Sequence, residues 1–195
     1  MEHTVSEPSY LLSSLVTHSR MDQLLEELCG IKTHEEELRA HTDQMTITEL
    51  KLHAIEDVGL PTLMDEALTL VTNDLEVEYG EIFELQLDGE SLLLRSAKGW
   101  EEELVGQATV PMDSPAGYAL KAEKSLIAED VSSDARFGVP LLLCEHGVKS
   151  SVRAIIRDQY HPLGVLGVDT TEQRAFTEDE VAFLQAVAGV LATVR

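Results

Sequence analysis

The sequence is poor in basic residues, and this limits the partners it can bind. Only 14 lysines and arginines stand against 36 aspartates and glutamates, so the formal net charge is −22 over 195 residues. A nucleic-acid-binding surface needs clustered basic side chains that displace counterions from phosphates. An anionic membrane surface repels a chain of this charge. We therefore expect neither nucleic acid nor a membrane surface as a partner.

Cysteines and long apolar runs are also scarce. Cys29 and Cys144 are too few for a disulfide framework and lack the spacing of metal ligands. No apolar run approaches the roughly 20 residues that span a bilayer, and the opening MEHTVSEPSY does not resemble a secretory signal. These absences predict a reduced, cytoplasmic protein without membrane insertion.

Residues 1–57 read as a helical region that is distinct from the rest. Apolar side chains recur there every seven residues, at Leu24, Ile31, Leu38, Met45 and Leu52. Three residues further on, the second seam consists of Glu27, His34, His41, Thr48 and Ile55. The seam is therefore only half apolar, which does not favour an autonomous coiled coil. Two interpretations stay open: the helix pairs two chains through Leu38, Met45 and Leu52, or it lies as one amphipathic helix on its own domain.

Residues 58–195 alternate between strand and helix patterns. Two strand-like runs, 79–87 and 91–97, flank Asp88-Gly89, a dipeptide favoured in tight hairpins. A second hairpin is predicted from 150–157 and 163–170. Apolar stripes predict flanking helices over 60–76 and from Glu178, the latter begun by the capping box Thr177-x-x-Glu180. Shorter elements are expected between the hairpins: helices at 116–122 and 140–146 and a strand at 125–129. The class is α+β, with a largely antiparallel sheet covered by helices on at least one face.

Several segments of this region resemble GAF domains, in the style of bacterial sensor histidine kinases. They are Ser114–Asp130, Asp134–Phe137, His146–Ser151, Leu163–Asp169 and the stretch that starts at Phe176-Thr-Glu-Asp-Glu. The resemblance implies a central antiparallel sheet of five or six strands, with the first and last helices packed together on one face. On the other face, small helices and loops of such domains commonly enclose a ligand pocket. Such domains usually sense rather than catalyse, and they often dimerise through terminal helices.

Special chemistries of the family fit this sequence poorly. Bilin-binding members attach the pigment through a cysteine followed by histidine, whereas Cys144 is followed by Glu145. Members that reduce free methionine sulfoxide rely on several cysteines in this domain. The cyclic-nucleotide pattern is only imitated at Phe176–Glu180, where the spacing is one residue short. Enzyme motifs such as the nucleophile elbow and the P-loop are also missing, so no cofactor is assigned.

The resemblance therefore predicts a non-catalytic sensory and regulatory domain of a signal-transduction protein, working in a dimer formed by Leu38, Met45, Leu52 and the C-terminal helix. Any output, such as a histidine kinase or nucleotide cyclase, is expected outside this chain. The alternative is a structural dimerisation and relay module with a filled interior. Candidate ligand-binding residues surround the expected pocket: Phe83, Tyr118, Asp130, Phe137, Leu142, Cys144, His146 and Val152.

Four residues allow two interpretations each. Cys144 is expected to be a small buried hydrophobe rather than a redox-sensitive thiol. His146, before Gly147, is expected to cap a helix end rather than contact a ligand. Arg153 lies in a predicted strand among apolar residues, and it either points to solvent or reaches an acidic neighbour. Trp100 is either a lid over the pocket or a satellite core aromatic.

Overall fold

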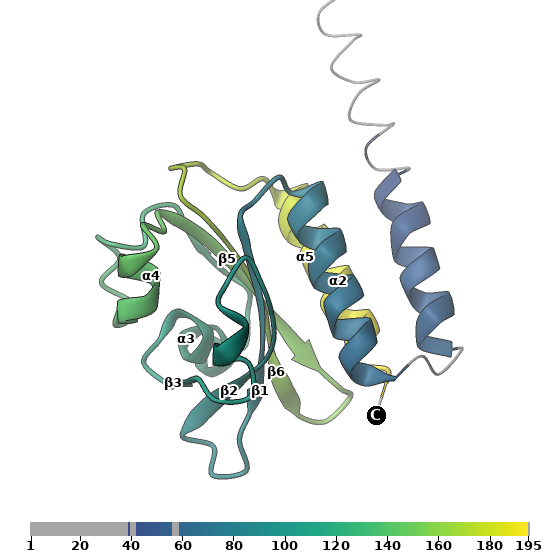
Figure 1. Cartoon of the computed structure of the whole chain (residues 1–195), viewed down its shortest axis with the longest axis horizontal. Coiled ribbons are helices and arrows are strands. Elements are labelled where there is room, and N and C mark those ends of the chain that lie inside the picture. The colour runs from purple at the N-terminus through teal and green to yellow at the C-terminus, as the bar shows by residue number, and fades with distance from the viewer. Residues whose placement is uncertain (1–38, 40–41, 56–58, 195) are drawn as a thin grey trace, which may run out of the picture. The chain divides into compact units, whose positions relative to one another are not determined.

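The structure is a computed structural model that describes residue 39 and residues 42–55 and 59–194 (Figure 1). The chain divides into two compact units, Met1–Gln44 and Met45–Arg195. Residues 42–55 are helical. The predicted seam residues Leu24, Ile31 and Leu38 lie outside the described residues.

The second unit is built on a six-stranded sheet in which every pair of neighbours is antiparallel. The strand order is β3-β2-β1-β6-β5-β4. The bounds are Tyr79–Leu85 for β1, Ser91–Lys98 for β2, Thr109–Pro111 for β3, Leu126–Ala128 for β4, Ser150–Arg157 for β5 and Pro162–Thr170 for β6.

Both predicted hairpins are confirmed. Gly89 turns the first hairpin with a φ of 69°, a conformation that glycine adopts at little cost. The short β3 was not predicted, because its three residues are too few to show a strand pattern in the sequence.

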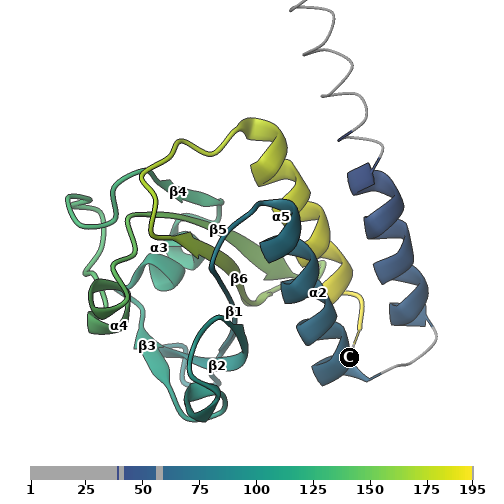
Figure 2. The same ribbon diagram turned by 45° about the horizontal axis from the view of Figure 1, so that its top comes forward.

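Two long helices cover one face of the sheet. They are α2, Leu60–Asp74, and α5, Glu178–Leu191, and they lie side by side in Figures 1 and 2. Pro61 occupies the first turn of α2, where its missing N–H costs nothing. The predicted capping box of α5 is present, with Thr177 and Glu180 each bonding to the backbone of the other.

The core between these helices and the sheet follows the alternation of the strands. Its sheet side includes Ile82 on β1, Val152 and Ala154 on β5, and Leu166 and Val168 on β6, all nearly inaccessible to water. Side chains one residue away along each strand therefore point to the opposite face.

That opposite face is covered by short elements rather than long helices. Helix α3, Pro115–Ala122, and helix α4, Leu141–Glu145, lie there with the connecting loops, as Figure 1 shows. A 3₁₀ turn, Glu102–Leu104, precedes β3. Two smaller apolar clusters fill the space beneath them. The α+β fold with helices on both faces is as predicted, and the pocket face is the one with α3 and α4.

Candidate functional site

A row of charged side chains lies buried on the α3/α4 face of the sheet. Glu81 of β1 and Arg153 of β5 are both in register with Gly167 of β6, the strand between them. Asp169 lies two residues further along β6. All three charged side chains are buried: Glu81 is 3% exposed, Arg153 2% and Asp169 0%.

Gly167 lets the two outer side chains meet. A Cβ atom at this position would lie 2.9 Å from both Cδ and Nη1 of Arg153, and closer still to Oε1 of Glu81. Any larger residue would therefore fill the space in which the carboxylate and the guanidinium approach each other. The glycine is required by this contact, and not by an unusual backbone angle.

Arg153 is held by contacts on almost every side. Its Nη2 donates to both carboxylate oxygens of Asp169, at 2.9 and 3.0 Å, and lies 2.9 Å from Glu81 Oε1. Its Nη1 donates to the carbonyl oxygens of Val152 and Val168, at 3.1 Å each. The interpretation that Arg153 points to solvent is wrong, because two buried carboxylates draw it to the inner face. The alternative, an acidic neighbour, is confirmed.

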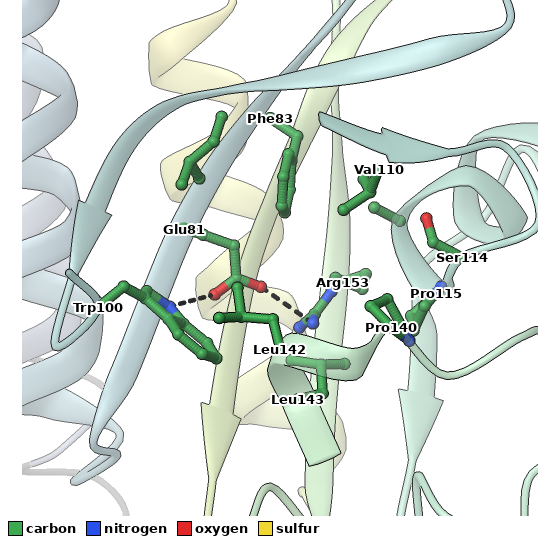
Figure 3. Close-up of a pocket in the computed structure, with 12 residues that line it drawn as sticks. Glu81, Phe83, Trp100, Val110, Ser114, Pro115, Pro140, Leu142, Leu143 and Arg153 are labelled. Atoms are coloured by element: carbon green, nitrogen blue, oxygen red, sulfur yellow. Dashed lines mark hydrogen bonds and ion pairs between the residues drawn. The ribbon is translucent and has the colours of Figure 1, made fainter. Parts of the chain in front are cut away.

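Trp100 completes the cluster from the loop after β2. Its indole Nε1 donates to Glu81 Oε2 at 3.2 Å, and Figure 3 shows the ring beside the Glu81 carboxylate. The other oxygen, Glu81 Oε1, is the one that forms the ion pair with Arg153 Nη2. Arg153 Nε and Ser151 Oγ have no hydrogen-bond partner, which is rare for buried polar atoms.

Burial changes the ionisation of both carboxyl groups. Loss of solvent raises the pKa of Glu81 to about 8, with Arg153 opposing the shift and Asp169 adding to it. Burial likewise raises the pKa of Asp169, which Arg153 partly offsets. Two carboxylates share one guanidinium here, so holding a proton on the acids near neutral pH brings the cluster to zero net charge.

A small cavity lies over this cluster, between the sheet and α3 and α4. Its free volume is about 30 Å³, room for one or two water molecules. Figure 3 shows Glu81 and Arg153 on its floor, with Trp100 and the α4 leucines around it. The lining is otherwise almost entirely apolar: Phe83, Leu94, Trp100, Val110, Pro115, Ala116, Pro140, Leu142 and Leu143, with Ser114 as the further polar residue.

The structure brings only two of the predicted site residues into this cavity, Phe83 and Leu142. Val152 faces the opposite side of the sheet and packs in the core beneath the long helices. Tyr118 and Phe137 pack on each other, with ring centroids 6.2 Å apart. Both belong to a neighbouring apolar cluster rather than to the cavity lining.

The remaining predicted site residues lie at the edge of the site. The Asp130 carboxylate accepts bonds from the backbone and hydroxyl of Ser132, and so closes a local turn. Cys144 is exposed, so the interpretation as a buried hydrophobe is wrong. Its neighbour Leu143 is the residue of α4 that turns inward.

His146 caps α4, as predicted. Its Nδ1 donates to the Leu142 carbonyl oxygen at 2.9 Å, and its Nε2 lies 3.2 Å from Glu101 Oε1. The imidazole also packs against Trp100, with centroids 4.9 Å apart. It therefore links α4 to the residue that bonds Glu81, without lining the cavity itself.

Glu81 and Asp169 are the site residues that sequence reasoning missed. The available signal was weak: Asp169 is the one acidic residue of β6, but β1 contains both Glu81 and Glu84, and nothing in the sequence separates the buried one from the exposed one. Pairing of the strands was needed to show that three such residues meet.

Within the described residues, no group of three or more histidine, cysteine, aspartate or glutamate side chains is arranged to hold a metal ion. Over the same part of the chain, no helix combines the length and the apolar character needed to cross a membrane.

Comparison with known proteins agrees with the fold described above. The family model of the GAF domain matches residues 59–194. A search of curated proteins finds no match. Among solved structures, the chain is similar to the GAF domain of a phosphoenolpyruvate-protein phosphotransferase from Acinetobacter, with 20% identity and a TM-score of 0.68, over 78% of this chain and 91% of that one.

Two further solved structures show the same fold. One is a free methionine-R-sulfoxide reductase from Neisseria meningitidis, with 12% identity and a TM-score of 0.66, over 77% of this chain and 86% of the other. The other is part of a methyl-accepting chemotaxis protein, with 15% identity and a TM-score of 0.64, over 74% and 93%. The chain belongs to the GAF domain family, whose members are generally non-catalytic regulatory and sensory domains of signalling proteins.

Proposed function

We propose that this domain senses a small molecule in the cavity between the sheet and α3 and α4, and relays its binding through the terminal helices of a dimer. The observation that carries the proposal is the cavity itself, which lies between the sheet and α3 and α4, with apolar walls and the ion pair of Glu81 and Arg153 in its lining. Mostly apolar walls with a few polar groups are typical of sites for small molecules.

The free volume of about 30 Å³ requires the cavity to open for any organic ligand, because pockets for such ligands usually enclose about 300–1,000 Å³. Helix α4 is the wall best suited to move. It has five residues, of which only Leu143 is buried, and Leu141 is 71% exposed. Few buried contacts mean a low free energy of local opening.

A route from the cavity to the long helices runs through β5. Arg153 faces the cavity, while Val152 and Ala154 on either side of it pack in the core that contains α5 residues. A shift of β5 at Arg153 therefore changes the packing beneath α5. A ligand moves such an equilibrium only by the difference in its affinity for the two arrangements.

The helix at 42–55 supports the proposed dimer. Met45 and Leu52 are 56% and 51% exposed, while Ile47 and Leu50 are buried. One face of the helix thus packs against the core, and the predicted seam leaves two large apolar side chains available to a second chain.

We further propose that the domain belongs to a cytoplasmic protein of the two-component type, whose catalytic output lies outside this chain.

A thermal-shift screen of the full chain against a metabolite library tests the proposal. We expect one chemical class to raise the melting temperature of the wild type. Leu142→Trp, which adds bulk to the half-buried cavity wall, should abolish that effect while leaving the fold intact by circular dichroism. If no compound of any class moves the melting temperature, ligand sensing is refuted.

One observation favours a second function, a relay module that binds no ligand. The cavity is nearly filled by side chains, and Arg153 already supplies a cation to both carboxylates. In that case Leu142→Trp leaves the thermal response to every compound unchanged, and the domain acts only through its helices.

A further inference from the structure

We propose that the cavity binds an uncharged, apolar compound of the size of a single ring, of the benzene class, and that it rejects anions and cations alike. The inference rests on the proposed function, since it names the ligand class of the same cavity. It is carried by the partners of the polar groups in the lining and by the apolar side chains that form the rest of it.

The polar groups of the lining are turned to protein partners. Glu81 Oε2 accepts from the Trp100 indole N–H at 3.2 Å, and Oε1 pairs with Arg153 Nη2 at 2.9 Å. Arg153 Nη1 donates to two carbonyl oxygens, and Nε, which has no partner, is itself buried. Ser114 Oγ accepts from the backbone N–H of Gly117 at 3.2 Å. A ligand in the cavity therefore finds no accessible hydrogen-bonding atom in the walls.

Burial of the walls excludes charged ligands. None of the lining side chains is exposed, and Glu81, Leu94 and Leu143 are each at most 5% exposed. A charge carried into the cavity would therefore leave water. An ammonium or carboxylate group that loses water without gaining a partner is strongly destabilised, and a hydroxyl or amide group is destabilised less. The walls thus select against charge of either sign.

The same walls favour an apolar molecule over water. The free volume of about 30 Å³ has room for water, but a buried water molecule needs about two to four polar partners. Because the walls offer none, water gains little by entering. Side chains that face an unfilled space lack dispersion contacts on that side. An apolar ligand restores those contacts and displaces no tightly held water.

Two aromatic side chains make the cavity suitable for a ring. Phe83 of β1 and Trp100 of the loop after β2 both line it, as Figure 3 shows, and each is 8% exposed. Trp100 is held by further rings, with centroids 4.4 Å from Tyr79 and 4.9 Å from His146. Aromatic pairs favour offset and edge-to-face arrangements with centroids about 4.5–7 Å apart. Phe83 and Trp100 can offer such contacts to an entering ring.

A ring needs more room than the free volume provides, and a displacement of α4 supplies it. Leu142 and Leu143 are the residues of α4 in the lining. Moving α4 outward uncovers their apolar surface, which an apolar ligand covers again and a charged one does not. His146, directly after α4, packs on Trp100, which bonds Glu81. The displacement therefore reaches the buried charged cluster.

Fluorescence of the full chain tests the proposal, because Trp100 is its one tryptophan and lines the cavity. Three probes share a ring and a bromine atom that quenches tryptophan on contact: bromobenzene, 4-bromobenzoate and 4-bromobenzylammonium. At pH 7 and matched ionic strength, bromobenzene should quench saturably, and both ions should bind more weakly by about tenfold or more. At five times its Kd, bromobenzene should raise the melting temperature by about 2–4 °C.

Two variants locate the bound ring without adding a tryptophan. Leu142→Phe adds bulk to the cavity wall and should weaken quenching by bromobenzene by about fivefold or more. Leu141→Phe is the matched control: Leu141 lies on the same helix, is 71% exposed and is not in the lining, so this variant should respond like the wild type. Equal quenching of the two variants would place bromobenzene outside the cavity and contradict the inference. If L142F does not fold, the three probes on the wild type decide the matter.

The remaining outcomes separate this inference from the proposed function. Binding of either ion as tightly as bromobenzene overturns the ligand class. A charged library compound whose effect on the melting temperature is lost in Leu142→Trp also overturns it, while sensing stands. If bromobenzene produces no saturable quenching, the inference is refuted. If in addition no library compound moves the melting temperature, the proposed function is refuted with it.

Discussion

Glu81 and Arg153 lie on strands that do not pair with each other, and they meet across Gly167 of the strand between them. Strand β6 lies between β1 and β5 in the sheet, so these two strands share no backbone hydrogen bonds. The ion pair of Glu81 and Arg153 connects them through their side chains. It lies at the centre of the sheet, on the face that carries the cavity.

The first prediction concerns Gly167. Gly167→Ala places a Cβ against the Arg153 side chain and the Glu81 carboxylate, so it should lower the free energy of unfolding by about 2–4 kcal/mol through overpacking and loss of the ion pair. Chemical denaturation measures this. Gly189→Ala is the control: it lies in α5, and its Cβ would meet nothing within 4 Å. That change should stabilise the protein by about 0.5–1 kcal/mol, and equal behaviour of the two variants would contradict the assignment.

The second prediction concerns the buried arginine. Arg153→Met leaves two buried carboxyl groups without a cation, which should destabilise the domain by about 3–5 kcal/mol. Adding Glu81→Met should cost less than the sum of the single changes, because the two residues interact directly. Arg95→Met, which breaks an exposed pair with Glu84 at 3.2 Å, should cost less than about 1 kcal/mol. A similar loss in R95M and R153M would show that burial does not govern these pairs.

Much of the fold was predictable because its signals are local. The dipeptide Asp88-Gly89 between two strand-like runs predicts the first hairpin. Thr177, three residues before Glu180, predicts the start of α5. Each signal spans only a few residues of the chain. The strand β3 is too short to carry such a signal. Helix bounds agreed to within about two residues for α2 and α3, and α5 begins at Glu178 as predicted.

The site was less predictable because it depends on strand pairing. Alternation correctly placed Arg153 opposite Val152, but what it meets depends on the register of β1 and β5 against β6. The sequence shows no link between Glu81 and Asp169. Cys144 was misplaced for a related reason: α4 has five residues, and such a short helix does not establish which of its apolar residues turn inward.

The third prediction concerns the cap of α5. The Thr177 hydroxyl accepts from the backbone N–H of Glu180 at 3.2 Å, so Thr177→Ala should lower the free energy of unfolding by about 1 kcal/mol. Thr177→Ser keeps the oxygen and should retain most of the stability. Urea denaturation of both variants gives the comparison, and a loss of the same size in T177S would exclude the cap as the cause.

The fourth prediction concerns the proposed dimer. Leu52→Asp and Met45→Asp place charge on the exposed seam of the 42–55 helix, and together with Leu38→Asp they should convert a dimer to monomers in sedimentation velocity. Circular dichroism should show an unchanged fold, since neither described side chain is buried. Glu49→Lys, which changes the charge at an exposed position of the same helix outside the seam, is the control. A dimer that persists in the triple variant would refute this use of the seam.

The last prediction follows from the ionisation of Glu81. Its pKa in the folded protein, about 8, lies above the ordinary 4.5 because burial disfavours the charge, so between these values the folded state binds more protons than the unfolded state. Stability should therefore fall as pH rises from about 5 to 8, with a slope of at most about 1.4 kcal/mol per pH unit.

Glu180 acts in the opposite sense: burial raises its pKa, but the Thr177 backbone N–H and Arg174 lower it overall, so its contribution to stability is lost only in acid. Urea denaturation across pH 4–9 should show a falling slope for the wild type and for E180Q, and a flatter profile for E81Q. A wild-type slope that E81Q leaves unchanged would mean that the proton resides elsewhere.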